Sequence, residues 1–201
     1  MPLLPIVVGS ILAVLAIGMI AWLIYLGRPQ PAQNPTVAGI PCDHLEHAQI
    51  HYHAALQIMY NGVLTNIPAN TGIEQDSAGN VTCYYWLHVH PADPNVIHIE
   101  SPASSTFTLG QFFAVWNAFS QQHGQGARKL DPTHVATFTI GPDQKIVTYI
   151  DLDDGKGPQV YNGDPSAIPL KSHETITIEV TPPDVNPPPT LNWTQAPYSG
   201  L

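Results

Sequence analysis

The chain begins with an uncharged apolar run that is long enough to cross a membrane as a helix and long for a cleaved signal peptide. Residues 3–26 are almost all apolar, and no charged side chain precedes Arg28. At about 1.5 Å per residue, a helix of this length crosses a hydrocarbon core about 30 Å thick. Trp22 and Tyr25 lie near its C-terminal end, where aromatic belts form. The run predicts a single transmembrane anchor over residues 1–27. A cleaved signal peptide is the alternative, although the run has no basic n-region and no clear A-x-A site.

Proline-rich segments divide the rest of the chain. Residues 28–41 have the composition of a semi-extended linker, and residues 181–201 form a tail whose prolines exclude regular helix or central strand. Residues 42–180 lie between them and are long enough for one domain with its own core. Within the tail, Leu191, Trp193 and Tyr198 are large side chains that can attach it to a surface.

The charge of the chain argues against nucleic acid as a partner and favours a membrane or membrane-protein partner. Six basic residues against fifteen acidic ones give a net charge of -9, so nucleic acid is not an expected partner. Only 10% of the residues are charged, which is low for a freely soluble surface. We therefore expect the membrane, and one or more membrane-protein partners, to cover part of this chain.

The two cysteines bear on the compartment. Cys42 and Cys83 are the only cysteines, and in an oxidising compartment they predict one disulfide. Two buried free thiols are the alternative. Arg28 alone weakly favours a cytoplasmic C-terminal domain by the positive-inside rule. The cysteines, the acidic charge and the histidines favour a single-pass protein of the cell membrane with its C-terminal domain extracytoplasmic, that is, periplasmic.

Alternating patterns predict a mainly β domain with one amphipathic helix, a small sheet or barrel behind the anchor. Residues 51–60 and 63–67 flank Asn61-Gly62, a dipeptide typical of a type I′ hairpin turn. Further strands are predicted over residues 135–140, 145–150 and 174–180. The helix begins at a capping box, Thr108 to Gln111, and its apolar residues recur at helical spacing to form one core-facing side. They are Leu109, Phe112, Phe113, Trp116 and Phe119.

Histidines in an alternating pattern are the main indication of function. His51 and His53 form one H-x-H pair and His88 and His90 another, and residues i and i+2 of a strand share a face. Residues 84–90 and 96–100 predict a second hairpin. If its turn centres on Asp93, His88 pairs with His98 and His90 with Val96, so three imidazoles converge. Glu100 would lie one pair further along, beside Trp86.

Imidazole is the commonest protein ligand for several transition metals. The sequence therefore predicts a metal site made by His51, His53, His88, His90 and His98, with copper or zinc as the leading ions. Glu100 is the one carboxylate near this set that can act as a further ligand or a general base. The alternative is that these histidines are solvated or hydrogen-bonded to one another without a metal. His44 and His47 are expected to be peripheral, and His123, His134 and His173 are scattered.

Several motifs together resemble a family of bacterial membrane-anchored or secreted proteins with one extracytoplasmic domain and no assigned activity. The resemblance covers residues 42–180. The matching segments are His51-Tyr52-His53, Asn61-Gly62, Ile67-Pro68-Ala69-Asn70-Thr71-Gly72-Ile73, residues 83–90, Ile97-His98-Ile99-Glu100-Ser101-Pro102, residues 108–116, residues 161–165 and residues 168–170. One departure concerns the metal site. The family pattern has H-T-H-D, whereas this chain has His88-Val89-His90-Pro91, so an aspartate that can bind or orient a ligand is missing.

Three functions remain open on the sequence alone. The first is a membrane-anchored domain that binds or delivers a transition metal without catalysis. The second is an accessory single-pass subunit of a larger electron-transfer or photosynthetic membrane complex, with structural histidines. The third is a metal-dependent enzyme. Serine-nucleophile elbows, phosphate-binding loops and C-x-x-C motifs are absent from the sequence.

Overall fold

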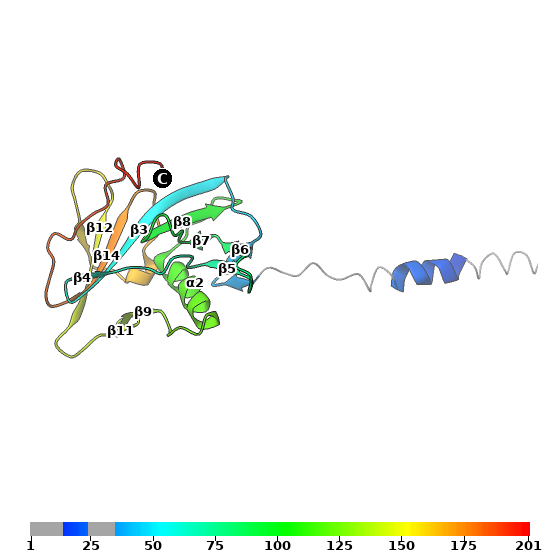
Figure 1. The fold of residues 1–201 in the computed structure, drawn as a ribbon, viewed down its shortest axis with the longest axis horizontal. Helices are drawn as coiled ribbons and strands as arrows, with labels where there is room; N and C mark the ends of the chain where they lie inside the picture. The colour runs from blue at the N-terminus through cyan, green and yellow to red at the C-terminus, as the bar shows by residue number, and fades with distance from the viewer. Residues whose placement is uncertain (1–13, 24–34) are drawn as a thin grey trace, which may run out of the picture. The chain divides into compact units, whose positions relative to one another are not determined.

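The computed structural model describes residues 14–23 and 35–201, and these form two separate units. Residues 14–23 are helical. No helix among the described residues combines the length and the hydropathy needed to cross a membrane. The predicted anchor over residues 1–27 lies largely outside the described part of the chain. The second unit, Pro35–Leu201, is mainly β, as predicted, with its principal sheet curled into half a barrel (Figure 1).

The principal sheet has seven strands. Its order is β13 (Gln159–Tyr161), β12 (Lys145–Asp151), β14 (Thr175–Thr181), β3 (Ile50–Tyr60), β8 (Val96–Ser101) and β7 (Leu87–His88), and β4 (Val63–Thr65) also pairs with β3. All neighbours are antiparallel except β14 and β3, which run parallel from Thr175–Ala55 to Val180–Tyr60. Strand β3 is therefore the centre of the sheet, and it joins the C-terminal strands to those that carry the histidines.

The predicted Asn61-Gly62 hairpin is confirmed. Tyr60 pairs with Val63 across the turn. Asn61 and Gly62 have φ angles of 52° and 76°, and a type I′ turn requires positive φ at both central positions. Asparagine and glycine are the residues that adopt this conformation at least cost, so the sequence fixes the end of β3 locally.

The second predicted hairpin is confirmed in part. His88 pairs with His98 and Leu87 with Ile99, in the expected register. The ladder ends at His88, so the expected pairing of His90 with Val96 is wrong, and His90 lies in the following loop. The predicted strand over residues 84–90 is also interrupted at Trp86, because β6 (Val81–Tyr85) belongs to another sheet.

A neighbouring loop explains this interruption. The backbone amides of Tyr85 and Val89 donate to the carbonyls of Gly72 and Thr71 at 2.9 Å, on either side of Trp86 and β7. Gly72 has a φ of 79°, and a Cβ there would lie 2.7 Å from the Leu87 carbonyl oxygen. Only glycine allows this close approach, so Gly72 helps to position the strand that carries His88.

Two smaller sheets complete the domain. The first has the order β1 (Thr36–Val37), β2 (Ile40–Asp43), β6 and β5 (Ile73–Gln75). The last residues of the predicted linker, 36–41, thus belong to the folded unit, where Ile40 is buried. The second sheet has the order β11 (Phe138–Thr139), β10 (His134–Ala136) and β9 (Lys129–Asp131). The single strand predicted over residues 135–140 is wrong, because His134 pairs back onto Thr139.

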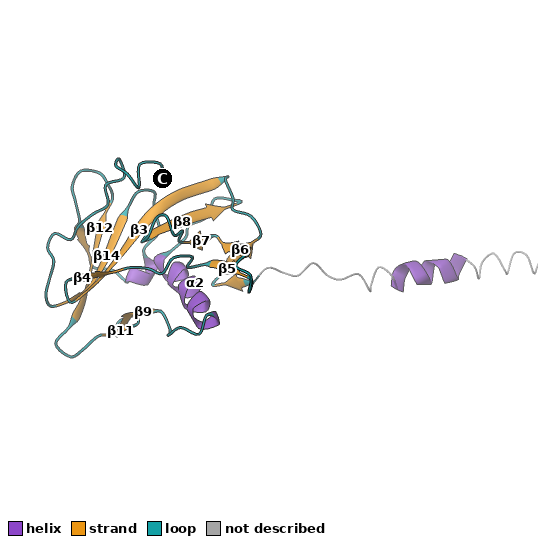
Figure 2. Cartoon of the chain, in the orientation of Figure 1, coloured by secondary structure: helices purple, strands orange, loops and turns teal. Residues whose placement is uncertain are grey.

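The predicted helix, α2 (Leu109–Gln122), is confirmed together with its capping box (Figure 2). The Thr108 side chain accepts from the Gln111 amide, and the Gln111 side chain accepts from the Thr108 amide. Its apolar side enters one core with Leu56 and Ile97 of the principal sheet. The 3-10 helix η1 (Pro165–Ala167) lies close to α2, since a Cβ on Gly110 would lie 2.7 Å from the Ser166 carbonyl oxygen.

The Pro-rich tail packs onto the opposite face of the principal sheet. Strand residues alternate between faces, so Ala55 of β3 and Val96 of β8 lie on the face turned away from Leu56 and Ile97. Trp193 is buried against both of them, and Leu191 and Tyr198 pack around it. The expected attachment of the tail is confirmed, and it covers the sheet next to the histidines.

The predicted disulfide is also confirmed. Cys42 of β2 and Cys83 of β6 are joined with their Cα atoms 5.4 Å apart. Both side chains are buried in the main core. The bond ties together the chain segments that continue to Glu46 on one side and to His88 on the other.

Candidate metal centre

Three of the predicted ligands form a row across three adjacent strands. His53 of β3 pairs with His98 of β8, which pairs in turn with His88 of β7. Directly opposed residues of neighbouring strands share a face, so the three imidazoles project on the same side. That side is the outer face, opposite the core packed by α2. All three residues are nevertheless buried, with at most 5% of their surface exposed.

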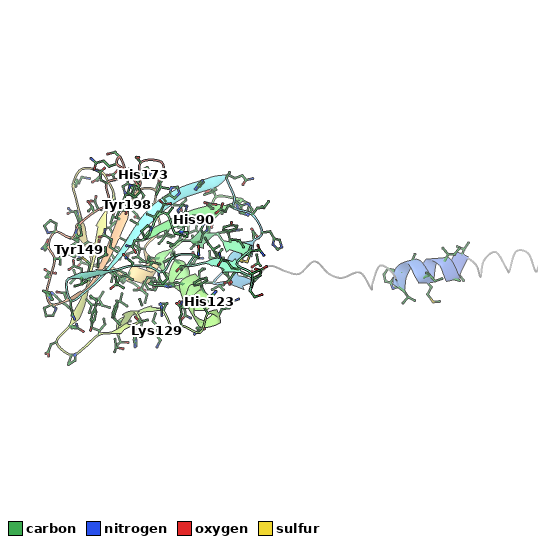
Figure 3. The ribbon with its side chains drawn as sticks, viewed as in Figure 1. His90, His123, Lys129, Tyr149, His173 and Tyr198 are labelled. Atoms are coloured by element: carbon green, nitrogen blue, oxygen red, sulfur yellow. A yellow bond between two sulfur atoms is a disulfide. The ribbon has the colours of Figure 1, made fainter. Side chains whose placement is uncertain are left out.

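The remaining predicted ligands lie next to this row. His51 is two residues before His53 and pairs with Glu100, which is two residues after His98. His90 leaves the end of β7, and its Nε2 lies 3.0 Å from His88 Nε2. The structure therefore brings all five predicted histidines and Glu100 together. Figure 3 shows His90 near the position that β7 and β8 have in Figure 1, apart from His123 and Tyr149.

The donor atoms divide into two groups. His88, His90, His98 and Glu100 offer one set of atoms that lie within 4.8 Å of one another, and His51, His53 and His98 offer a second. Zinc–nitrogen bonds of about 2.0–2.1 Å place tetrahedral ligand atoms roughly 3.3 Å apart, so the most distant donors of a group must approach each other by up to about 1.5 Å to bind one ion. His98 belongs to both groups.

His88 is held in one tautomer. Its Nδ1 lies 2.8 Å from the Tyr85 carbonyl oxygen. Because a carbonyl only accepts, Nδ1 must donate its proton, and in the neutral ring Nε2 is left with a lone pair. Metal-bound histidines commonly use their second nitrogen in this way, which fixes the ring and increases the basicity of the ligand.

In the second group, formed by His51, His53 and His98, not every close nitrogen–nitrogen contact can be a hydrogen bond. His53 Nε2 lies 3.1 Å from His51 Nε2 and 3.1 Å from His98 Nδ1. One proton on His53 Nε2 can serve only one of these contacts well. On the other side of its ring, His98 Nε2 is buried and has no hydrogen-bond partner among the described residues. Converging lone pairs and an unpaired buried nitrogen are a suitable environment for a cation.

Sequence reasoning missed two carboxylates beside the histidines, Glu46 and Asp93. Glu46 Oε1 lies 2.9 Å from His90 Nε2 and 3.5 Å from His88 Nε2. Glu46 lies in the loop between β2 and β3, and no periodic pattern indicates where that loop folds. Asp43 anchors the loop, because its carboxylate accepts hydrogen bonds from Trp86 Nε1 and His47 Nε2, each at 2.7 Å. The carboxylate of Asp93 lies 3.7 Å from His98 Nε2.

The other histidines have partners outside the cluster. His44 Nδ1 bonds to the Thr82 carbonyl, His123 Nδ1 to the Phe119 carbonyl, and His134 Nδ1 to the Asp131 carboxylate. The backbone amide of His173 donates to the His53 carbonyl, but its ring stacks on Trp193 in the tail. This distribution agrees with the division made from the sequence.

Burial and neighbouring histidines lower the pKa of two imidazoles of the cluster, His53 and His90. Burial, followed by the charges of His98 and His51, lowers the pKa of His53 to about 3. Burial and the neighbouring His88 lower the pKa of His90. Burial alone would raise the pKa of Glu100, but the hydrogen bond with His98 and the charge of His88 outweigh it, and the net pKa is lowered. Neutral imidazoles beside a carboxylate are the protonation states that bind metal.

The depressed pKa of His53 predicts acid sensitivity of the metal-free protein. The ordinary histidine pKa is 6.5. Between about pH 6 and pH 3, His53 is therefore protonated in the unfolded chain but neutral in the folded chain. The free energy of unfolding is not reduced by His53 above pH 6.5. Below about pH 6 the ionisation of His53 lowers it by about 1.4 kcal/mol per pH unit. Urea unfolding in EDTA at pH 7, 5.5 and 4.5 measures this loss. His53→Gln, which cannot titrate, is expected to show a shallower dependence; equal slopes would contradict the assignment.

A separate cavity of about 1080 Å³ lies over the other end of the principal sheet. Among its lining residues are Lys145, Tyr149, Tyr161, Asp164 and Asp184, and none of the five clustered histidines lines it. We take the histidine cluster as the candidate site because its groups converge in geometry and chemistry, whereas the cavity has no comparable constellation.

Comparisons with protein-family models, with curated proteins and with solved structures each found no match. The interpretation of this site therefore depends on its own geometry.

Proposed function

We propose that this protein binds a transition metal ion through the histidine cluster on the outer face of its principal sheet. The observation that carries the proposal is the row His53–His98–His88, whose buried imidazoles face one another across three strands. Nε2 of His98 supports it, because this buried atom has no hydrogen-bond partner in the described part of the chain, and the Asp93 carboxylate lies 3.7 Å away. A buried polar atom without a hydrogen bond is costly unless a ligand uses it. The lowered pKa values of His53 and His90 keep protons from competing with the metal.

The ligand set favours Zn(II) or Cu(II). Imidazole nitrogens with one carboxylate suit either ion, and the soft sulfur ligands that Cu(I) prefers are not part of the cluster. Both cysteines are joined in the disulfide and cannot act as thiolates. His88, oriented by the Tyr85 carbonyl, would be the most rigid ligand.

We propose a binding or delivery role on the extracytoplasmic, periplasmic side of the cell membrane rather than catalysis. The Cys42–Cys83 bond supports an extracytoplasmic domain, because disulfides persist in oxidising compartments. The exposed side chains of His51 and His90, at 46% and 28%, put the cluster within reach of solvent and of a partner that exchanges metal. We also propose that residues 1–27 anchor the protein in the membrane and that it has a membrane-protein partner.

Metal analysis of the purified full-length protein tests this function. Protein freed of metal by chelation is dialysed against Zn(II) or Cu(II) at pH 7 and then against metal-free buffer. At least one ion per chain is expected to remain, and its release is expected on acidification as protons compete for the imidazoles. Recovery of protein with less than a tenth of an ion per chain would exclude a metal-binding role.

A further inference from the structure

The cluster has more donors than a four-coordinate ion uses, and they do not form a single group. The ligand atoms of a single ion with bonds of about 2.1 Å lie within roughly 4.2 Å of one another. Each group, with its donor atoms within 4.8 Å, is close to this limit, whereas the five histidines and Glu100 do not form one such group. The five rings instead separate into two groups that share His98. Each group has one partly exposed histidine at its rim, His90 in the first and His51 in the second. The shared part is buried.

Glu100 connects the two groups. It belongs to the group of His88, His90 and His98, yet its Oε1 lies 3.2 Å from His51 Nε2, a member of the other group. The same oxygen lies 3.6 Å from His98 Nδ1 and 4.0 Å from His88 Nε2. This carboxylate is only 6% exposed, so the histidines around it largely replace water as its partners. Its position is that of a carboxylate bridging two cations.

The cluster also has the charge that two divalent ions require. Two cations about 4 Å apart repel each other strongly inside a protein, and an anion between them offsets that repulsion. Glu100 supplies a negative charge between the groups. Glu46 supplies another at the rim, 2.9 Å from His90 Nε2.

We propose that the cluster is a dinuclear centre, with one ion bound by His88 and His90, a second by His51, His53 and Nδ1 of His98, and Glu100 bridging the two. His98 is assigned to the second ion because its Nδ1 lies 3.1 Å from His53 Nε2 and one nitrogen lone pair binds only one ion. Glu46 is in position to complete the shell of the first ion. This inference rests on the proposed metal binding and adds the number of ions and the role of each group.

Copper(II) provides a test, because the ion is paramagnetic and two bridged ions interact. Metal-free full-length protein is titrated with Cu(II), the bound ions are counted after dialysis, and the electron paramagnetic resonance signal is integrated. The parent is expected to bind two ions and to give a signal well below its copper content at saturation. At half saturation fewer chains hold two ions, so the integrated signal per bound copper ion is expected to be larger than at saturation.

Rim variants identify the groups. His51→Ala and His90→Ala each remove one partly exposed ligand from a different group, so each is expected to bind one ion with a full, uncoupled signal. His134→Ala removes a histidine outside the cluster and is expected to behave as the parent does.

The outcomes distinguish the two proposals. One ion in the parent would overturn the dinuclear centre and leave the proposed metal binding standing. No bound ion would overturn both. Two ions that remain in both rim variants, or that give the full signal in the parent, would place the ions elsewhere and would also overturn the dinuclear centre.

Discussion

Replacing His88 and His98 together with alanine is expected to lower the affinity for Zn(II) and Cu(II) by at least about 100-fold. The change leaves two donors in each group, His90 with Glu100 and His51 with His53. Loss of groups that merely orient a ligand costs 10–100-fold, and loss of the ligands themselves should cost more. Titration calorimetry or equilibrium dialysis of the full-length protein measures the change.

A matched variant controls for the loss of histidine itself. His123→Ala with His134→Ala also removes two imidazoles, but both bond outside the cluster, so parental affinity is expected. Because His88 and His98 are buried, the corresponding double glutamine variant retains more of their volume if the alanine variant unfolds. Equal binding by the glutamine variant and the parent would show that the row does not hold the metal.

Changing Cys42 and Cys83 together to alanine is expected to lower the free energy of unfolding by about 4 kcal/mol. The bond closes a loop with a sequence separation of 41 residues, and loss of this constraint enlarges the unfolded ensemble. Both side chains are also buried, so their truncation removes packing. Urea denaturation followed by tryptophan fluorescence measures the difference.

The parent protein in reductant serves as the control for this variant. Reductant is expected to destabilise the parent toward the variant and to leave the variant unchanged. Protein isolated from its native compartment is expected to carry no thiol that can be alkylated. Two reactive thiols per chain would contradict both the bond and the extracytoplasmic placement that it supports.

The parts of the fold that were predictable are those encoded locally. Asn61-Gly62 determines its own turn, and the capping box at Thr108 determines the start of α2. The pairing of His88 with His98 needed only a turn near Asp93 and alternating strands. These features depend on residues close together in the sequence, so pattern and propensity suffice to find them.

The parts that were missed depend on distant segments. The strand that contains His88 is divided at Trp86 because Thr71 and Gly72 bond to it from another loop. The carboxylate of Glu46 reaches His90 because the disulfide and Asp43 hold its loop in place. The site was predicted to include His53, but its direct pairing with His98 across β3 and β8 was not, because no hairpin turn joins these two strands. Such contacts are decided by tertiary packing, which a single sequence does not display.

The parallel pairing of β3 with β14 has a consequence for the order of assembly. Gln57 and Thr177 lie side by side in the sheet but are separated by 120 residues in the sequence. The strands that carry the histidines span only residues 50–101, so their contacts can form while the remainder of the chain is still being made. Until residues 175–181 arrive, one edge of β3 offers unpaired amides and carbonyls to any other extended chain. Non-local pairing of this kind is slow, so we expect protection of this edge during biosynthesis to limit the yield of folded protein.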